Sequence, residues 1–337
     1  MSEHFIKNIE IKNFKCFEDF KAEGFGRVNL IGGKNNVGKT AFMEACFITT
    51  SLDVSDMYKK LLEINTHRNV INQLLDTNPR VHDLRELIIT YKKLNIFSSY
   101  HEIDIKEELN GNISIEIIDN MIFGKDEDIS SSLSTKYNLS DLINFLDVNI
   151  LHTKVANSMN FISQNSNADY SLNMIIDDAK LMNKLDVLNK YLFEMFKIDS
   201  IDTIKYKPFV KIGDKYSELA HFGQGIKTFI NIISSMLLLE DDFIFIDEVE
   251  NGIHYSHLDR LWEIILTISR DQKVQVFATT HSKECIESYA RVAKKLEDKD
   301  ITFIDLGKNK KNEIKAIVMN SERFQREIEM RNEVRGW

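Results

Sequence analysis

The chain has 337 residues, which is enough for two modest domains or for one domain with a large insertion. Its composition, 43% hydrophobic and 28% charged, is typical of a globular protein, and 2 prolines with 13 glycines argue against long disordered linkers. Acidic residues outnumber basic ones by 52 to 43, so a protein that coats nucleic acid is not expected. We interpret the basic runs 205–207 and 308–311 as solvated loops rather than a DNA-binding patch.

Neither the cysteines nor the apolar segments suggest an extracellular or membrane protein. Cys16, Cys46 and Cys285 are scattered without metal-ligand spacing, as expected for unpaired thiols in a reducing compartment. The first residues have neither the apolar run nor the cleavage site of a signal peptide. The apolar segment 229–239 is far shorter than the ~20 residues of a membrane span. We therefore expect a cytoplasmic protein with no membrane partner.

The first half of the chain mixes strand and helix patterns. Alternating residues predict the strands 5–11, 17–22 and 27–31, and from Lys39 the pattern turns helical and is expected to stay helical over 51–98. Residues 101–105 and 113–117 predict a β-hairpin because an Asn-Gly pair, Asn110 and Gly111, joins them. The polar, serine-rich segment 124–139 is expected to be a surface loop, and 160–163 a short strand.

The second half alternates helices with strands. Apolar spacing predicts one or two helices over 170–197, followed by short strands near 201–204 and 209–212. The remaining expected elements are helix 226–240, strand 243–247, helix 255–270, strand 273–279, helix 282–296 and strand 301–306. Such alternation is typical of crossover units in a parallel sheet with helices on its faces. There is no internal repeat and no heptad pattern long enough for a coiled-coil arm.

A glycine-rich loop follows the strand 27–31 and opens the next helix. Its sequence, Gly33-Lys34-Asn35-Asn36-Val37-Gly38-Lys39-Thr40, fits the phosphate-loop pattern G-x-x-x-x-G-K-[ST]. Glycines let backbone N–H groups surround a phosphate, and the helix N-terminus adds partial positive charge. Lys39 would reach the β- and γ-phosphates, and the Thr40 hydroxyl would bind Mg²⁺. The sequence therefore predicts ATP and Mg²⁺ as ligands; the alternative is a glycine turn with a surface lysine.

An apolar strand that ends in two acids lies later in the chain. Phe243-Ile244-Phe245-Ile246 precedes Asp247 and Glu248, and such a run is typical of a parallel strand buried on both faces. In this Walker B arrangement Asp247 would hold Mg²⁺ through water, and Glu248 would be the general base that polarises the attacking water. The alternative is that the two acids cap the following helix.

A histidine follows the next strand. Residues 279–282 read Thr279-Thr280-His281-Ser282. A histidine at the end of the neighbouring parallel strand can contact a γ-phosphate and detect its loss. Without the preceding Walker B strand, His281 would be interpreted as a capping residue.

Together and in this order, these motifs resemble the ABC-type ATPases related to RecF and to OLD-family proteins. The resemblance also includes Gly223-Gln224-Gly225, the segment 250–254 after the Walker B acids, and the opening segment 9–17, and it spans residues 5 to about 306. It implies an α/β fold: an ABC-type P-loop ATPase head with a mixed N-terminal sheet, a central, largely parallel sheet and a helical insertion. The ATPase core would be 1–50 and 200–320. An inserted lobe of helices and a β-hairpin, 51–199, would include a helical arm at about 170–197, and 321–337 would be a C-terminal helix.

The resemblance also assigns roles to residues outside the phosphate loop. Gly223, Gln224 and Gly225 would form the signature loop, which grips the γ-phosphate bound by the partner subunit, although a plain glycine turn also fits. The family's usual signature serine is replaced here by Gly223, which leaves only backbone donors and bears on the rate of hydrolysis.

Two further loops follow from the resemblance. Glu250, Asn251 and Gly252 would form the D-loop, which contacts the other subunit. Gln164 would be the Q-loop glutamine near Mg²⁺, with Gln73 as the alternative. A site shared in this way implies two heads that enclose two nucleotides, so a homodimer is the minimum and a higher oligomer is compatible.

The biological role is expected to involve a separate effector. Only about thirty residues follow the strand 301–306, too few for the Toprim nuclease domain of OLD-family nucleases. The first hypothesis is an ATPase that senses a trigger and controls an effector, such as a nuclease, as in ATPase components of anti-phage defence systems resembling PARIS or Septu. The alternatives are a RecF-like ATP-dependent clamp on DNA and a nucleotide-locked scaffold with little hydrolysis. GTP stays open because no identified residue reads the base.

Overall fold

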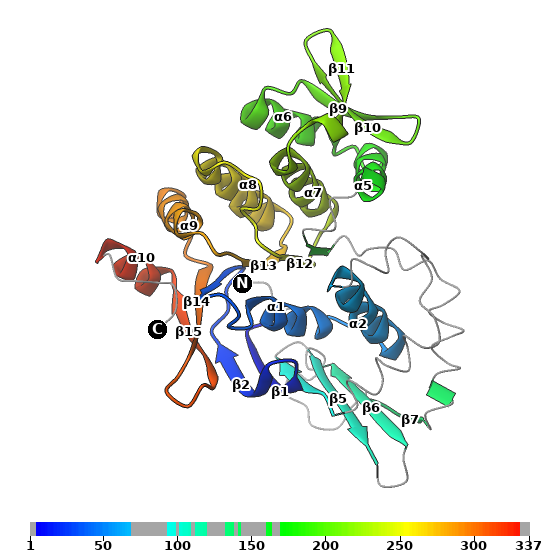
Figure 1. Ribbon diagram of the computed structural model, residues 1–337, viewed down its shortest axis with the longest axis vertical. Helices are drawn as coiled ribbons and strands as arrows, with labels where there is room; N and C mark the ends of the chain where they lie inside the picture. Colours follow the sequence, from blue (N-terminus) through cyan, green and yellow to red (C-terminus); the bar gives the residue numbers. More distant parts are fainter. Residues whose placement is uncertain are drawn as a thin grey trace.

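The computed structural model describes residues 5–68, 93–98, 101–108, 112–119, 132–137, 141–142, 160–163 and 169–330. These residues form layers (Figure 1), from an antiparallel sheet at the bottom of the view, through a central sheet and its covering helices, to a small lobe at the top. Within the described ranges, no helix has the length and apolar character needed to cross a bilayer. Cys16, Cys46 and Cys285 form no disulfide bond in the described part of the chain.

The central sheet carries the strands that lead to the predicted motifs. Its order is β15-β14-β3-β13-β12-β8, and every neighbouring pair is parallel except β14 with the edge strand β15. Its strands are β3 (Val28–Gly33), β8 (Phe161–Ile162), β12 (Phe243–Ile246), β13 (Gln275–Thr279), β14 (Ile301–Lys308) and β15 (Ile314–Asn320). All four residues of β12 are buried, and β12 pairs with parallel strands on both sides. The prediction of a buried central strand is confirmed.

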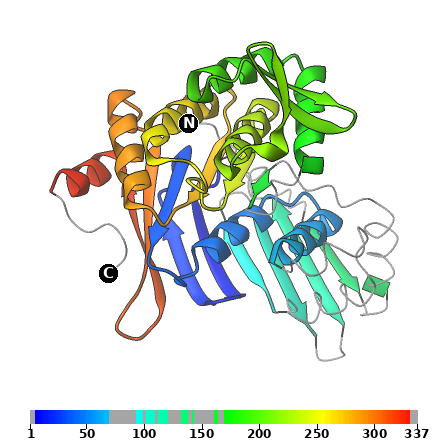
Figure 2. The ribbon, with the colours of Figure 1, turned by 45° about the horizontal axis from the view of Figure 1, so that its top comes forward.

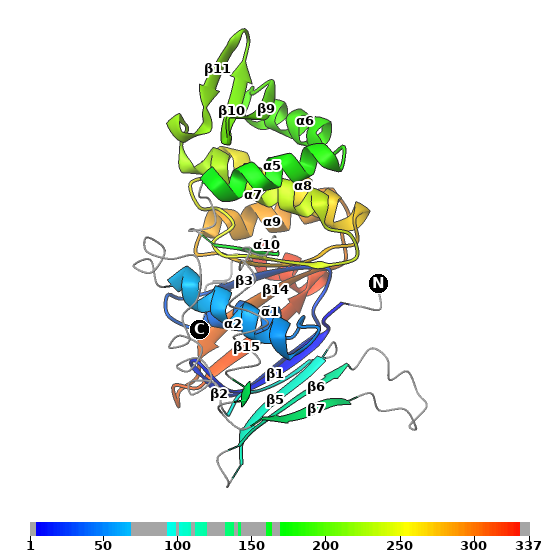
Figure 3. The same ribbon diagram turned by 90° about the vertical axis from the view of Figure 1, so that its right-hand side faces the viewer.

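Helices cover one face of this sheet. They are α7 (Gln224–Leu238), α8 (Leu258–Asp271) and α9 (Lys283–Lys295), seen in Figure 3 above the sheet; α10 (Ser321–Glu329) packs against α9, β14 and β15. Helices α7, α8 and α9 each follow or precede a parallel strand, as in a crossover connection. The predicted alternation of helices and strands in the last third is therefore confirmed.

The second six-stranded sheet is antiparallel at each described pairing. Its order is β2-β1-β4-β5-β6-β7. The strands are β1 (Asn8–Phe14), β2 (Phe17–Glu23), β4 (Asn95–Ser98), β5 (His101–Glu107), β6 (Ile113–Asp119) and β7 (Ser132–Tyr137). The fold is thus a mixed α/β architecture in which the parallel strands are confined to the central sheet.

The N-terminal sheet corrects two expectations. Residues 95–98 were expected to be helical but form β4, whose pairing with β1 puts Ile96 opposite Ile11. Residues 132–137 were expected to be a loop but form β7, because pairing with β6 satisfies their backbone groups although their side chains carry no hydrophobic alternation. The predicted hairpin is confirmed by the register of β5 and β6, and its turn, 109–111, lies outside the described residues.

Helix α1 (Lys39–Ile48) lies between the two sheets and is followed by α2 (Val54–Arg68), as Figure 2 shows. The α1 side chains contact aromatic residues of both sheets. The Phe42 ring is 5.6 Å from Phe20 of the antiparallel sheet, and the Phe47 ring is 5.4 Å from Phe245 of the central sheet. Aromatic pairs at these distances stabilise a core beyond the burial of their area. The helix that follows the phosphate loop is thus fixed by both sheets.

A small lobe, residues 169–218, projects beyond α7; we call it the arm lobe. It consists of α5 (Asp169–Leu181), α6 (Leu185–Phe196), β9 (Ser200–Ile204), β10 (Lys207–Ile212) and β11 (Lys215–Glu218). Helices α5 and α6 contact α7, and the three strands form an antiparallel sheet. The two predicted helices are present, whereas β11 was not predicted from its four mostly polar residues.

Candidate nucleotide site

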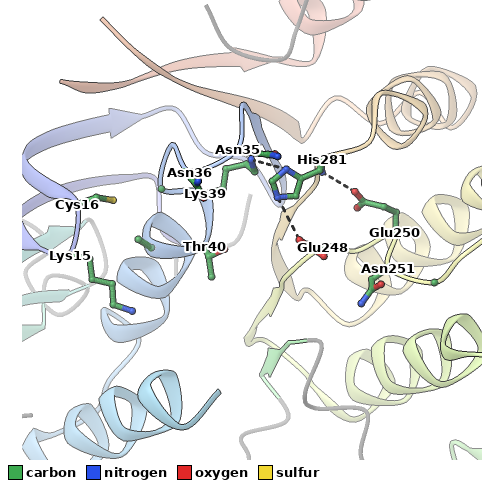
Figure 4. A pocket seen from close by; sticks show the side chains of 13 residues that line it. Lys15, Cys16, Asn35, Asn36, Lys39, Thr40, Glu248, Glu250, Asn251 and His281 are labelled. Atoms are coloured by element: carbon green, nitrogen blue, oxygen red, sulfur yellow. Dashed lines mark hydrogen bonds and ion pairs between the residues drawn. The ribbon is translucent and has the colours of Figure 1, made fainter. Parts of the chain in front are cut away.

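The ends of three neighbouring parallel strands open onto one cavity of about 1080 Å³ (Figure 4). Strands β3, β12 and β13 are adjacent and parallel, so their carboxyl ends lie at the same edge of the sheet. The cavity is lined by Lys15, Cys16, Asn35, Asn36, Gly38, Lys39, Thr40, Ala41, Glu248, Glu250, Asn251, Gly252 and His281. The volume is suited to a nucleotide-sized ligand.

The phosphate loop runs from Gly33 at the end of β3 to α1. Gly38, the N-cap of α1, has φ +94°, and a Cβ there would lie 2.7 Å from Cys16 Sγ, so both backbone and space require glycine. The Lys39 ammonium donates to the carbonyls of Gly33 and Lys34, both at 2.9 Å. Val37 is buried against the core rather than facing the cavity. The loop is therefore a closed turn held by its own lysine.

Lys39 is also close to the acids at the end of β12. Burial lowers the pKa of Lys39, and the carboxylates of Asp247 and Glu248 oppose that shift. In a partly buried site the interaction of the Lys39 ammonium with an anionic ligand is stronger than at an exposed surface, because the effective dielectric is lower.

Asp247 receives hydrogen bonds from two threonines. Thr40 Oγ1 donates to Asp247 Oδ1 at 3.1 Å, and Thr279 Oγ1 donates to the same oxygen at 2.6 Å. Burial raises the pKa of Asp247, and the threonine hydrogen bonds oppose the rise.

The pair Thr40 and Asp247 fits Mg²⁺. Their oxygens are the hard ligands that this ion prefers, and the half-buried carboxylate would be stabilised by a cation. No group of three or more His, Cys, Asp or Glu side chains within the described ranges could hold a metal by itself. Mg²⁺ usually keeps several waters and takes phosphate oxygens as ligands, so two protein ligands are sufficient.

Glu248 and His281 are direct neighbours in the lining of the cavity. The Glu248 N–H donates to Thr279 Oγ1 at 2.8 Å, and Glu248 has a left-handed backbone with φ +53°. His281 Nε2 lies 3.6 Å from Glu248 Oε1, while His281 Nδ1 lies 3.3 Å from Lys39 Nζ. The imidazole therefore lies between the phosphate-loop lysine and the acid that follows Asp247 (Figure 4).

The predicted D-loop and signature residues occupy different places. Asn251 and Gly252 line the cavity, whereas Gly223, Gln224 and Gly225 do not. The N-terminus of α7 instead touches the D-loop backbone: a Cβ on Gly225 would lie 2.1 Å from the carbonyl oxygen of Gly252. Two glycines are needed for this close approach.

Sequence reasoning did not single out two residues that line the cavity. Lys15 and Cys16 form the two-residue turn between β1 and β2, where Phe14 pairs with Phe17. Lys15 has φ +53° and forms an ion pair of 2.6 Å with Glu44 of α1. Their only signal was that they lie within the opening segment that resembles the family's first strand, and only the packing of the two sheets brings them to the phosphate loop.

The expected Q-loop residue is not placed by the structure. Gln164 lies outside the described residues, as does the alternative, Gln73.

A family model described as an AAA ATPase domain matches residues 53–286, which is more than half of the chain. The matched part includes Asp247, Glu248 and His281 and begins after the phosphate loop. The chain is also similar to a protein of Helicobacter pylori named ATP/GTP phosphatase, with 24% identity over 334 residues that cover 84% of this chain and 86% of the relative.

Two further similarities are more distant. An uncharacterized protein of Methanocaldococcus jannaschii is 30% identical over 118 residues, which cover 33% of this chain and 53% of that protein. The fold resembles the head of an SMC protein, solved in complex with the C-terminal winged-helix domain of ScpA. That match has a TM-score of 0.51 and 11% identity and covers 96% of this chain and 99% of the SMC head.

The Gly225–Gly252 contact predicts that alanine substitution lowers the melting temperature at Gly225 but not at the nearby Gly223. Gly225→Ala places a methyl group against the Gly252 carbonyl and should lower the melting temperature by several degrees, a cost of about 1–3 kcal/mol. Gly223→Ala meets open space at an ordinary φ of −63° and should leave the melting temperature unchanged. Differential scanning calorimetry of both variants without nucleotide tests the contact, which is refuted by equal melting temperatures.

The half-buried Asp247 carboxylate is predicted to lower the stability of the nucleotide-free protein while it favours the binding of a cation. Because burial raises its pKa, the ionised form destabilises the nucleotide-free protein at neutral pH, and this destabilisation is relieved as the pH falls and the carboxyl group is protonated. Asp247→Asn should therefore raise the melting temperature without ligand by about 2 °C, the shift expected from ~1 kcal/mol. The difference from the unmodified chain should shrink toward acidic pH. A lower melting temperature at neutral pH would contradict the assignment.

Proposed function

This chain belongs to the AAA ATPase domain family, and we propose that it binds ATP with Mg²⁺ and hydrolyses it to ADP and phosphate at a site completed by a second copy of the chain. The observation that carries the proposal is that Lys39 and Thr40 of α1 line one cavity together with Glu248, which follows β12, while Thr40 donates to the neighbouring Asp247. These are the groups that phosphoryl transfer to water requires.

Each group has a role that follows from its position. The N-terminus of α1 and Lys39 would hold the β- and γ-phosphates, and Thr40 with Asp247 would hold Mg²⁺, which neutralises charge on the transferred phosphoryl group. Glu248 would accept a hydrogen bond from the attacking water and orient it. His281, between Lys39 and Glu248, would contact the γ-phosphate.

The need for a second copy is inferred because the cavity has no signature-loop residue in its lining. The residues that resemble the signature loop lie at the N-terminus of α7 and do not line the cavity of their own chain. The backbone N–H groups at the N-terminus of this 15-residue helix, together with its dipole, favour an anion. Placed over the nucleotide of a second copy, they would bind its γ-phosphate. Gly223 contributes no side chain there, so binding would rely on backbone donors.

Two substitutions test the proposed ATPase. Lys39→Ala should weaken binding of a fluorescent ATP analogue by at least about tenfold, because it removes the cation that contacts the phosphates. Glu248→Gln should retain binding and lower kcat by about 10²–10⁴-fold, because it removes a general base. With ATP and Mg²⁺ it should also raise the dimer fraction measured by light scattering.

The exposed Lys299→Ala is the control and should match the unmodified chain. Binding that is indifferent to Lys39→Ala would refute the nucleotide site, and an oligomeric state indifferent to ATP in Glu248→Gln would refute the shared site.

We further propose that the ATPase controls a separate effector protein, as in anti-phage defence, and that the arm lobe is its contact surface. Of the 13 large hydrophobic residues that are exposed in the described ranges, nine lie in this lobe: Met174, Leu181, Met182, Val187, Phe193, Ile204, Tyr206, Ile212 and Tyr216. Leu181 is 80% exposed. Such a concentration is typical of a surface that another protein covers.

A second candidate, a clamp on DNA, is favoured by the hairpin that joins β9 and β10. Its two turn residues, Lys205 and Tyr206, both have left-handed backbones, with φ +51° and +63°, which are unfavourable without glycine. Tyr206 is 94% exposed, and the side chain of Asn173 on α5 donates to its carbonyl. The hairpin between β10 and β11 uses Gly213 in the corresponding turn. A strained turn that presents a cation and an aromatic ring suits a nucleic-acid contact.

Retention on DNA separates these two roles. A DNA clamp should show ATP-dependent retention on duplex DNA that weakens by at least about tenfold between 50 and 200 mM salt, because phosphate contacts release counterions. The double variant Lys205→Ala, Tyr206→Ala should reduce this retention, while Lys310→Ala in the other basic run serves as the control. An effector-controlling ATPase predicts no ATP-dependent retention at either salt concentration, and clear retention would favour the clamp.

A further inference from the structure

The turn that follows the Walker B acids holds the histidine loop through one carboxylate. Glu250 Oε1 accepts hydrogen bonds from Thr280 Oγ1 at 2.8 Å, from the His281 N–H at 2.8 Å and from the Ser282 N–H at 3.1 Å. These three donors belong to consecutive residues between β13 and α9. Figure 4 shows that the Glu250 side chain points toward the backbone of His281.

This anchoring matters because the imidazole has few other restraints. The His281 side chain is 40% exposed, and its neighbours are Lys39 at 3.3 Å and the carboxylate of Glu248 at 3.6 Å. A half-exposed ring with two polar neighbours takes its position mainly from its backbone. On the C-terminal side that backbone is continued by Ser282, the N-cap of α9, whose hydroxyl accepts from the Cys285 N–H.

The second oxygen of Glu250 faces inward. Glu250 Oε2 is buried and is not the oxygen that accepts from the histidine loop. Behind it lies the buried Cys285 thiol, whose pKa is raised by burial and by the charge of Glu250. A carboxylate that uses one oxygen within its own chain and buries the other is not oriented to reach a second copy.

We propose that Glu250 is a positioning residue that holds His281 in place to contact the γ-phosphate, rather than a contact to the partner subunit. This inference rests on the ATPase function proposed above. It revises the role that family resemblance implied for Glu250, while Asn251 and Gly252 remain at the cavity edge. The carboxylate acts as an acceptor of hydrogen bonds, so the position of its oxygen matters more than its negative charge.

The comparison of Glu250→Gln with Glu250→Ala tests this role. The Gln amide oxygen can accept the same three hydrogen bonds, whereas Ala removes the acceptor of Thr280 Oγ1 and of the His281 N–H; the Ser282 N–H keeps its second acceptor, Thr280 Oγ1, at 3.0 Å. Glu250→Ala should lower kcat by about 10–100-fold, the range seen when the partner that orients an active side chain is removed. Glu250→Gln should restore most of kcat. Combining Glu250→Ala with His281→Ala should lower kcat no further than His281→Ala alone, because both act through the same ring.

Amide hydrogen exchange gives a readout that does not depend on hydrolysis. Without nucleotide, exchange at the His281 amide should rise at least about tenfold in Glu250→Ala and stay near the original rate in Glu250→Gln, while the Ser282 amide, which also donates to Thr280 Oγ1, should change less. Glu287→Ala on the same helix α9 is the control, because Glu287 is exposed to solvent and pairs only with Lys283 among the described ion pairs. The full chain is used throughout.

The outcomes are distinct. Unchanged exchange in Glu250→Ala, or a Gln variant as slow in hydrolysis as the Ala variant, overturns the positioning role; the second result would instead indicate a charge contact such as one to a partner subunit. If the unmodified chain neither binds nor hydrolyses ATP, the proposed function fails, and the exchange comparison still decides whether Glu250 anchors the loop.

Discussion

Burial of helix α1 is the constraint on which the rest of the structure depends. Nine of its 10 residues are buried, which leaves the helix no solvent-facing side on which to shift. It begins at the last residues of the phosphate loop, so the aromatic contacts that Phe42 and Phe47 make with the two sheets also fix the loop. Even its buried acid, Glu44, is compensated by Lys15 from the neighbouring hairpin. A close-packed core thus provides a rigid base for the nucleotide cavity.

Asp247, which follows β12, has the opposite effect on stability from that of the α1 packing. Asp247 is half-buried and desolvation raises its pKa, so its ionised form is costly until a cation approaches. Thr40 and Thr279 donate to one of its oxygens and reduce this cost without removing it. Stability of the empty protein and affinity for a metal-bound phosphate therefore oppose each other at this position, as is common where function needs an unfavourable local arrangement.

The turn 250–252 contacts both the histidine loop and the N-terminus of α7. By family resemblance, the histidine loop would contact the nucleotide of its own chain and the N-terminus of α7 the nucleotide of the other subunit. On one side Glu250 accepts from the backbone of the histidine loop. On the other side Gly252 packs against Gly225 at a distance that admits no side chain. Movement of this turn must displace the N-terminus of α7 as well, because two backbones in contact cannot slide without a change in their packing.

The sequence by itself determined the features that consist of consecutive residues in the chain. The phosphate loop, the all-apolar strand that ends in Asp247, and the alternation of helices and strands in the last third are continuous patterns, and a single period or motif identifies each of them. The α/β fold class followed from that alternation.

The tertiary structure decided which segments, far apart in the sequence, are in contact. Strands β4 and β7 carry weak local signals and exist because β1 and β6 supply backbone partners. Lys15 reaches the cavity only because two sheets enclose α1, and the inward direction of Glu250 follows from the packing of α9 behind it. Such contacts join residues far apart in the chain, so no local window of sequence contains them.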